Sequence, residues 1–330
     1  MKQLRDDNEI ASFAVLPDEP EPFVPEWPAE CPAPGVYEVP YEEYRAWPAI
    51  NASALKLGYQ VSPKHLKAAI DGRLDSDSRA RKLGRAIHCR LLEPDLFRKQ
   101  FMIAEQCKVP VASGTRKGQP CGSAGRFYDA DNHQWYCGTH RKQFPDAAEP
   151  TDYIDSAEAE RIELIVASVF AHKVVKLLRA HGGAEVSIIW AKDGFPCKAR
   201  LDKWIRGAKC PDTVLDLKKC QVGKATEEAL QRSIRDYGWD MQAAWYLAAA
   251  ESIDDARPLF AWVFLEDNEP FDARPVWASP AMLEVGAIKA RTAFDLYKRC
   301  VETGRWPGYC EDIEQLDPAD WELKRYGMQS

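Results

Sequence analysis

The sequence predicts an α/β fold in which a three-strand meander and one further strand are flanked by helices. Stretches rich in β-branched and aromatic residues at 184–191, 195–205 and 212–220 have the length and residue types of successive strands. Stretches with helical periodicity precede and follow them. The chain has 330 residues, of which 45% are hydrophobic, and this is enough to build a sizeable core.

The N-terminal stretch differs from the rest in composition. Residues 1–50 carry 11 acids, 3 bases and nine of the 23 prolines. Such a composition is typical of an extended, poorly ordered tail, so we expect a tail over 1–49 and a folded domain over 50–330. The chain has a net charge of −7, but residues 1–50 account for −8, so residues 51–330 have a net charge of about +1. The folded part can therefore hold a local basic groove.

Three helices are predicted before residue 100. Ser53 is a possible cap for a short helix in "INASALKLGY". The next helix covers 62–72, with Pro63 in its first turn and Gly72 past its end. The third helix covers 78–94, because its apolar residues fall on one stripe: Leu83, Ile87 and Leu91.

The second half alternates between strands and helices. One long helix is expected over 156–183, ending at a Gly-Gly pair. Asp193-Gly194 between the first two strands is a hairpin signal. The remaining elements follow in chain order: helices over 226–238 and 239–252, a strand over 258–267, and a helix over 279–304.

Charged residues recur on the three strands, where burying one alone costs several kcal/mol. Side chains two apart share a strand face, so Asp216 lies beside Lys218, and Asp202 is expected on one face with Lys198 and Arg200. Two converging carboxylates suit Mg²⁺ or Mn²⁺, and a lysine beside them can orient a water or stabilise charge on a phosphate. Alternatively, Asp216 and Lys218 are a solvated pair on an exposed face.

Five segments occur together in the order and approximate spacing of the RecE-type exonucleases (exodeoxyribonuclease VIII) of the PD-(D/E)XK superfamily. They are "GRAIHCRLLEPDLF", "AEVSIIW", "CKARLDKW", "VLDLKKC" and "YGWDMQAAWYL". The chain resembles this family over about residues 50–300. The resemblance implies a PD-(D/E)XK core and Mg²⁺-dependent 5′→3′ digestion of one strand of linear duplex DNA. It also implies 3′ overhangs for an annealing recombinase, and assembly into a ring.

The resemblance also implies roles for single residues, each with a structural alternative. Asp202, Asp216 and His88 are similar to the family's metal ligands, and Lys218 to its catalytic lysine, whereas Pro211-Asp212 is not the catalytic pair. Gln242 and Tyr246 resemble a Q-x-x-x-Y pair that touches the DNA end or supports the site; they share a helix face. His88 and Tyr246 can instead be core residues. Glu185 holds either a metal-bound water or only an arginine.

Residues 107–143 form an insertion with a metal-binding pattern. Cys107, Cys121, Cys137 and His140 give C-x13-C-x15-C-x2-H in a Gly-rich stretch without apolar periodicity. A structural Zn²⁺ bound by these four residues supplies the folding energy that such a stretch lacks. His133 is a spare ligand, and an unstructured loop with unrelated cysteines is the alternative. The insertion has a net charge of +4, which favours contact with DNA phosphates.

The sequence gives two further indications. It has no apolar run near 18 residues and no signal-peptide core at its N-terminus, so we expect a cytoplasmic protein. Two other functions are possible besides the exonuclease. One is a non-catalytic DNA-binding adaptor on a nuclease fold, and the other is an endonuclease of the same superfamily.

Overall fold

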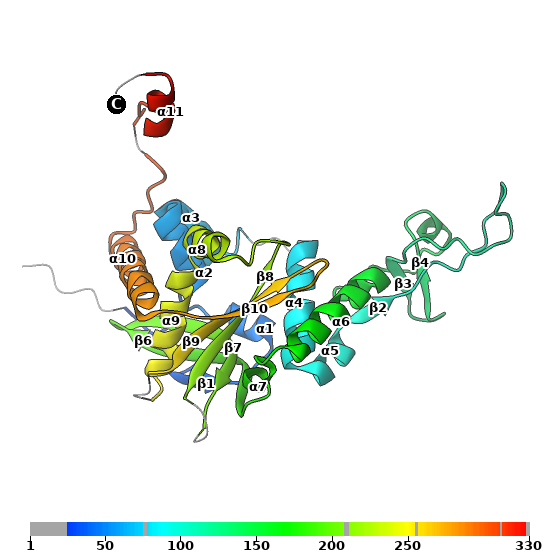
Figure 1. The fold of residues 1–330 in the computed structure, drawn as a ribbon, viewed down its shortest axis with the longest axis horizontal. Helices are drawn as coiled ribbons and strands as arrows, with labels where there is room; N and C mark the ends of the chain where they lie inside the picture. The colour runs from blue at the N-terminus through cyan, green and yellow to red at the C-terminus, as the bar shows by residue number, and fades with distance from the viewer. Residues whose placement is uncertain (1–24, 75–77, 208–210, 255–256, 311, 328–330) are drawn as a thin grey trace, which may run out of the picture.

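A six-stranded mixed sheet forms the centre of the molecule (Figure 1). The computed structural model describes residues 25–74, 78–207, 211–254, 257–310 and 312–327. The sheet has the order β1-β6-β7-β8-β9-β10; neighbouring strands are antiparallel except β8 and β9, which are parallel. Its strands are β1 (Gly35–Tyr37), β6 (Gly182–Lys192), β7 (Phe195–Ile205), β8 (Thr213–Cys220), β9 (Leu259–Glu266) and β10 (Ala273–Trp277).

Helices cover both faces of the sheet. On one face the first core packs the sheet against α2 (Ala52–Gln60), α3 (Pro63–Ile70), α8 (Glu227–Asp236), α9 (Trp239–Glu251) and α10 (Pro280–Thr303). On the other face the second core packs it against α4 (Arg79–Leu92), α5 (Pro94–Gln100), α6 (Ser156–Ala171) and α7 (Val175–Leu178). The predicted α/β class, with a meander, a further strand and flanking helices, is confirmed.

The meander is not regular throughout. The ladder between β7 and β8 ends where Lys203 pairs with Leu215, and beyond this pair β7 stays with β6 while β8 stays with β9. The strands therefore form a fork that begins at Asp202 and Asp216. The alternation of side chains also changes here, since Ala199, Leu201 and Trp204 all pack into the first core. Lys198, Arg200 and Asp202 line the same cleft, as their expected single face predicts, because the alternation changes only after Asp202.

The expectation of an unpacked acidic tail is wrong for residues 25–49; residues 1–24 lie outside the described residues. β1 pairs with β6, and α1 (Tyr41–Ala46) follows it. Tyr44 and Trp47 are buried in a small cluster with Ile189. Composition misses this because a few aromatic side chains and one short strand are enough to pack a segment that is otherwise acidic and Pro-rich.

Three other local expectations differ from the structure. The helix expected over 156–183 ends at Ala171, and Gly182 and Gly183 already belong to β6. The helix near Ser53 is capped by Asn51, whose side chain accepts a hydrogen bond from the Ala54 N–H. The strand β10 was not expected from the sequence. No helix in the described ranges has the length and apolar character needed to cross a membrane.

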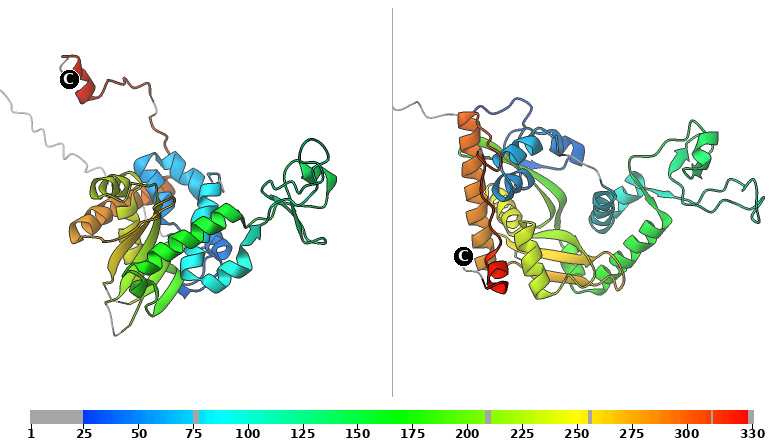
Figure 2. Two further views of the ribbon diagram at one scale, coloured as in Figure 1. Left: turned by 45° about the vertical axis from the view of Figure 1, so that its right-hand side comes forward. Right: turned by 90° about the horizontal axis from the view of Figure 1, so that it is seen from above.

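Residues 105–152, which we call the arm, project from the body between β2 (Met102–Ala104) and β5 (Tyr153–Asp155) (Figure 2). β2 and β5 pair in parallel and form the neck of the arm. The arm contains β3 (Phe127–Asp129), β4 (Gln134–Tyr136) and the short 3-10 helix His140–Gln143. The chain continues past α10 to a short helix, α11 (Asp320–Arg325). The insertion expected at 107–143 is thus two residues longer at its start and nine residues longer at its end.

Candidate active site

Three carboxylates occupy equivalent positions on neighbouring strands at the fork. The ladder between β6 and β7 skips the position at which Glu185 and Asp202 oppose each other. Asp216 lies one step beyond the last pair of β7 with β8, opposite Asp202. Glu185 has a φ of 50°, a left-handed conformation that is uncommon for a residue with a side chain and that is often found at functional sites.

His88 of α4 completes a group of metal-ligand atoms. His88, Glu185 and Asp202 each offer one such atom, and the three lie within 4.8 Å of one another. His88 Nδ1 is 3.4 Å from Asp202 Oδ2. The same carboxylate oxygen accepts a hydrogen bond of 2.7 Å from the Leu217 N–H, so Asp202 replaces the missing ladder contact across the fork. His88 and Asp202 therefore lie together, as expected. The third member of the group is Glu185, whereas we expected Asp216.

Asp216 lies beside this group and pairs with Lys218. Its carboxylate is 1% exposed, so the alternative of a solvated pair on an open sheet face is wrong. Lys218 Nζ is 2.5 Å from Asp216 Oδ2, and its ammonium lies 5.8 Å from the centre of the Trp239 ring. The Leu215 and Leu217 side chains point into the second core, as their alternation predicts.

Arg200 holds Glu185 in place. Its Nε donates to Glu185 Oε2 at 2.8 Å, and another guanidinium nitrogen donates to Ser187 Oγ at 2.9 Å and to the Val39 carbonyl at 2.8 Å. Glu185 was expected to hold either a metal-bound water or an arginine. It contacts an arginine, Arg200, and its carboxylate also lies in the group of possible metal ligands. Through Val39, Arg200 also connects the N-terminal segment to the site. The sequence could not show this, because Val39 and Arg200 are far apart in the chain.

Burial and mutual repulsion raise the pKa values of two of the carboxyl groups. Burial, followed by the charge of Asp216, raises the pKa of Asp202 to about 7. Burial, and then Asp202, raises the pKa of Glu185. Burial lowers the pKa of His88, which favours the neutral imidazole that a metal ion binds. These directions share their largest cause, since burial penalises the charged form of each group.

The raised pKa of Asp202 predicts a pH-dependent cost of folding. An unfolded aspartate titrates near pH 4, so the contribution of Asp202 to stability is present below that pH and lost as the pH rises through about 7. Without added divalent metal, Asp202→Asn should therefore be more stable than the wild type at pH 8, by on the order of 2 kcal/mol. The gain should shrink towards pH 5. Denaturant unfolding at both pH values checks this, and a pH-independent difference would contradict it.

Gln242 and Tyr246 of α9 form the predicted pair, since Gln242 Nε2 donates to the Tyr246 hydroxyl at 2.7 Å. Tyr246 lines a cleft of about 1280 Å³ together with His88, Glu185 and Asp202. The remaining wall of the cleft comes from the N-terminal segment, α2, α4 and α5. Tyr246 also packs partly against the first core, so both of its expected placements apply.

Two lysines differ from the sequence expectation. Lys198 does not reach the carboxylates; its Nζ donates to the carbonyls of Tyr44, Arg45 and Trp47 at 3.1, 2.9 and 2.7 Å. Lys56 of α2, which the sequence analysis missed, lies close enough to Lys218 for their charges to interact. Burial and then Lys218 lower the pKa of Lys56 to about 8. No local pattern marks Lys56, because only the packing of α2 brings it there.

A second group of ligand atoms lies in the arm. Cys107, Cys121, Cys137 and His140 each offer one atom, all within 4.8 Å of one another. His140 Nδ1 is 3.4 Å from both Cys107 Sγ and Cys137 Sγ, and the Cys121 and Cys137 sulfurs are 3.9 Å apart. A tetrahedral zinc site separates its ligands by about 3.5–3.8 Å. His133 is not part of the group; it contacts the Tyr128 hydroxyl at 3.0 Å.

Comparison with known proteins gives a family and a fold. Residues 51–318 match the profile of the PDDEXK-like domain of unknown function DUF3799. The structure is similar to that of a provisionally assigned exonuclease from Eubacterium rectale. The TM-score is 0.54 at 14% identity, over 87% of this chain and 98% of that chain. The structure of SSO0001 is matched with a TM-score of only 0.25 at 18% identity, over 51% and 73% of the two chains. None of the curated proteins matches the sequence.

Proposed function

The chain belongs to the PDDEXK-like domain family DUF3799, and from this premise we propose that it is a divalent-metal-dependent DNA exonuclease. The observation that carries the proposal is the convergence of His88, Glu185 and Asp202 in one cleft, with the pair of Asp216 and Lys218 beside them. A protein that only binds DNA gains nothing from burying these acids together, because each raises the cost of ionising the others.

The residues fit a hard divalent cation. Two carboxylates and an imidazole suit Mg²⁺ or Mn²⁺. Asp216 adds a further buried carboxylate next to this group, with Lys218 as its partner. A bound metal ion would polarise the scissile phosphate and lower the pKa of an attacking water.

The protein groups have separate tasks in this proposal. His88, Glu185 and Asp202 hold the metal, with Asp216 as a further ligand, and Arg200 fixes the carboxylate of Glu185. Lys218 orients the attacking water and offers its ammonium to the charge that develops on the phosphate oxygens. Tyr246 faces the cleft from α9, where it can contact the DNA end, and Gln242 holds its hydroxyl through a hydrogen bond.

We further propose RecE-type specificity: digestion of linear duplex from its 5′ ends, leaving 3′ overhangs. The support is the order of the five sequence segments together with this placement of their residues. The overhang would be the substrate of an annealing recombinase, and a ring-shaped oligomer would keep the enzyme on its DNA.

End-labelled DNA tests the activity and its polarity. With Mg²⁺, linear duplex should lose its 5′-terminal label first, and covalently closed circles should remain intact; EDTA should stop the reaction. Early release of the 3′ label would contradict the polarity. Nicking of circles would show an endonuclease, and binding without cleavage with any divalent metal would leave the adaptor function.

For the arm we propose one structural Zn²⁺, held by Cys107, Cys121, Cys137 and His140. Three thiolates and an imidazole are the ligands that zinc prefers, and their separations match a tetrahedral site. Four protein ligands leave no position for a reacting water. The three cysteines lie in a small apolar cluster around Tyr136, which stacks on Phe144 with ring centres 3.9 Å apart.

A further inference from the structure

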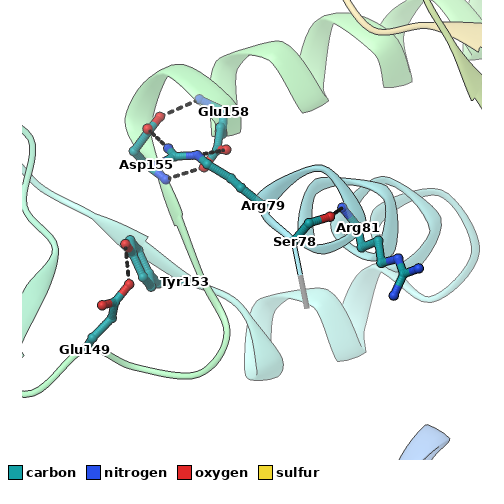
Figure 3. A network of polar contacts seen from close by, with 7 residues as sticks. All are labelled: Ser78, Arg79, Arg81, Glu149, Tyr153, Asp155 and Glu158. Carbon is teal, nitrogen blue, oxygen red and sulfur yellow. Dashed lines mark hydrogen bonds and ion pairs between the residues drawn. The ribbon is translucent and has the colours of Figure 1, made fainter. Parts of the chain in front are cut away.

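The arm is built onto the helix that carries His88. Figure 3 shows the junction: Arg79 at the start of α4 contacts both Asp155 and Glu158 at the start of α6. Asp155 and Glu158 also form a capping box with each other's backbone, so neither carboxylate is free to move away. The start of α6, which follows the arm in the chain, is therefore held firmly to α4.

The neck adds a second set of contacts. The Tyr153 hydroxyl donates to Glu149 Oε1 at 3.0 Å, and Arg126 Nε donates to Glu149 Oε2 at 2.9 Å (Figure 3 shows the first). Lys82 of α4 lies 4.8 Å from the centre of the Tyr153 ring. Because ion pairs, an aromatic contact and the β2–β5 ladder act together, the arm keeps one direction relative to the body.

The cleft leads to this neck. Arg81, Arg85 and His88, which are spaced like one face of a helix, line the cleft from α4. The lining continues along α5 through Lys99 to Phe101, the residue immediately before β2. A long ligand that lies in the cleft and leaves it at this end passes directly beside the arm.

The charges of the arm are sorted along its length. Its acids are as numerous as its bases, but three acids next to the neck are neutralised: Glu105 pairs with Lys108, Glu149 with Arg126, and Asp152 with Arg85, whereas Asp131 and Asp146 are exposed. Asp129 is buried and accepts the N–H groups of the β3–β4 turn. The distal bases Arg116, Lys117, Arg141 and Lys142 are exposed, and none of them pairs with a carboxylate among the described residues.

We propose that the distal arm is a second contact site for duplex DNA, which binds the phosphate backbone through Lys117, Lys142 and the arginines beside them. The inference rests on the proposed function, because it takes DNA as the molecule in the cleft. A rigid arm beside the mouth of the cleft, with its cations outward, contacts the duplex beyond the end that is being digested.

Equilibrium binding of two duplexes tests this. Lys117→Ala/Lys142→Ala should bind a duplex of about 40 base pairs roughly tenfold more weakly than the wild type, and its log–log salt slope should be smaller by about 1.8. A duplex of about 10 base pairs, which only fills the cleft, should be bound equally well by both proteins. No divalent metal and no chelator are added, so that the arm keeps its zinc.

Lys173→Ala/Lys176→Ala is the matched control, because it removes two exposed lysines just past the far end of α6. An equal loss in this control, or an equal loss for both duplexes, would show a general charge effect and overturn the proposal. Unchanged affinity of Lys117→Ala/Lys142→Ala for the longer duplex would also overturn it. An acidic protein segment would then be the next partner of the distal arm to test. Binding does not require cleavage, so the two proposals can fail separately. A protein that does not cleave DNA but whose double variant loses affinity only for the longer duplex would contradict the nuclease proposal and support the arm contact.

Discussion

Replacing Lys218 by methionine should lower the rate of DNA cleavage by about 10²–10³-fold. The ammonium of Lys218 lies 2.5 Å from Asp216 Oδ2 and its side chain is only partly exposed, so no mobile water or ion can easily take its place. Methionine keeps most of the apolar stem, and the fold should therefore be retained. Single-turnover cleavage of end-labelled linear duplex measures the effect, and circular dichroism checks the fold.

The next residue in the chain provides the control. Lys219 points away from Asp216 and pairs with Asp267, at 2.6 Å between Nζ and Oδ2. Lys219→Met removes the same charge one position along β8 and should cleave DNA within about threefold of the wild type, as is usual for a pair at the surface. Wild-type cleavage by Lys218→Met would remove the active-site assignment, and an equal loss in both variants would show that only the net charge of β8 matters.

Replacing Cys137 by serine should release the metal of the arm and unfold residues around it. Three thiolates and His140 hold the ribbons together where few apolar side chains are buried, and structural zinc contributes about 10–16 kcal/mol to folding in small zinc modules. The wild type should contain one zinc per chain by elemental analysis, and Cys137→Ser none. Proteolysis should then cut within 105–152, while the sheet remains resistant.

Cys310→Ser is the matched control, since Cys310 is an exposed free thiol far from the arm. It should keep its zinc and its resistance to protease. Zinc retained at full stoichiometry in Cys137→Ser, or absent from the wild type, would refute the assignment. Loss of zinc together with unfolding of the sheet would show that the arm and the body are one cooperative unit.

Much of the fold follows from local patterns that need no partner. The strands β6 and β7 are separated by Asp193-Gly194, and both of these residues have positive φ values of 50° and 81°. The stripe of Leu83, Ile87 and Leu91 is buried as its spacing predicts. The pairs Asp216–Lys218 and Gln242–Tyr246 are in contact because a strand has period two and a helix brings residues four apart together.

The sequence identifies the candidate metal ligands by residue type and order, but it does not show which of them lie together. We expected Asp202 and Asp216 with His88, whereas the tightest group contains Glu185. The reason is the kink at Asp202, where the strands part and alternation no longer tells which side chains meet. The alternation of residues along one strand does not show where its pairing with the next strand ends, because that depends on which neighbouring strand it pairs with.

The sequence by itself determined the α/β class, the meander, the buried stripes and the ligand types of both candidate metal sites. Each of these depends on residues close in the chain or on the chemistry of single side chains. The tertiary structure alone decided that Arg200 holds Glu185, that Lys56 approaches Lys218, and that the N-terminal segment packs on the sheet. It also decided that the arm is fixed to α4. These contacts join residues far apart in the chain, and their free energy comes from packing and electrostatics that exist only once the sheet has formed.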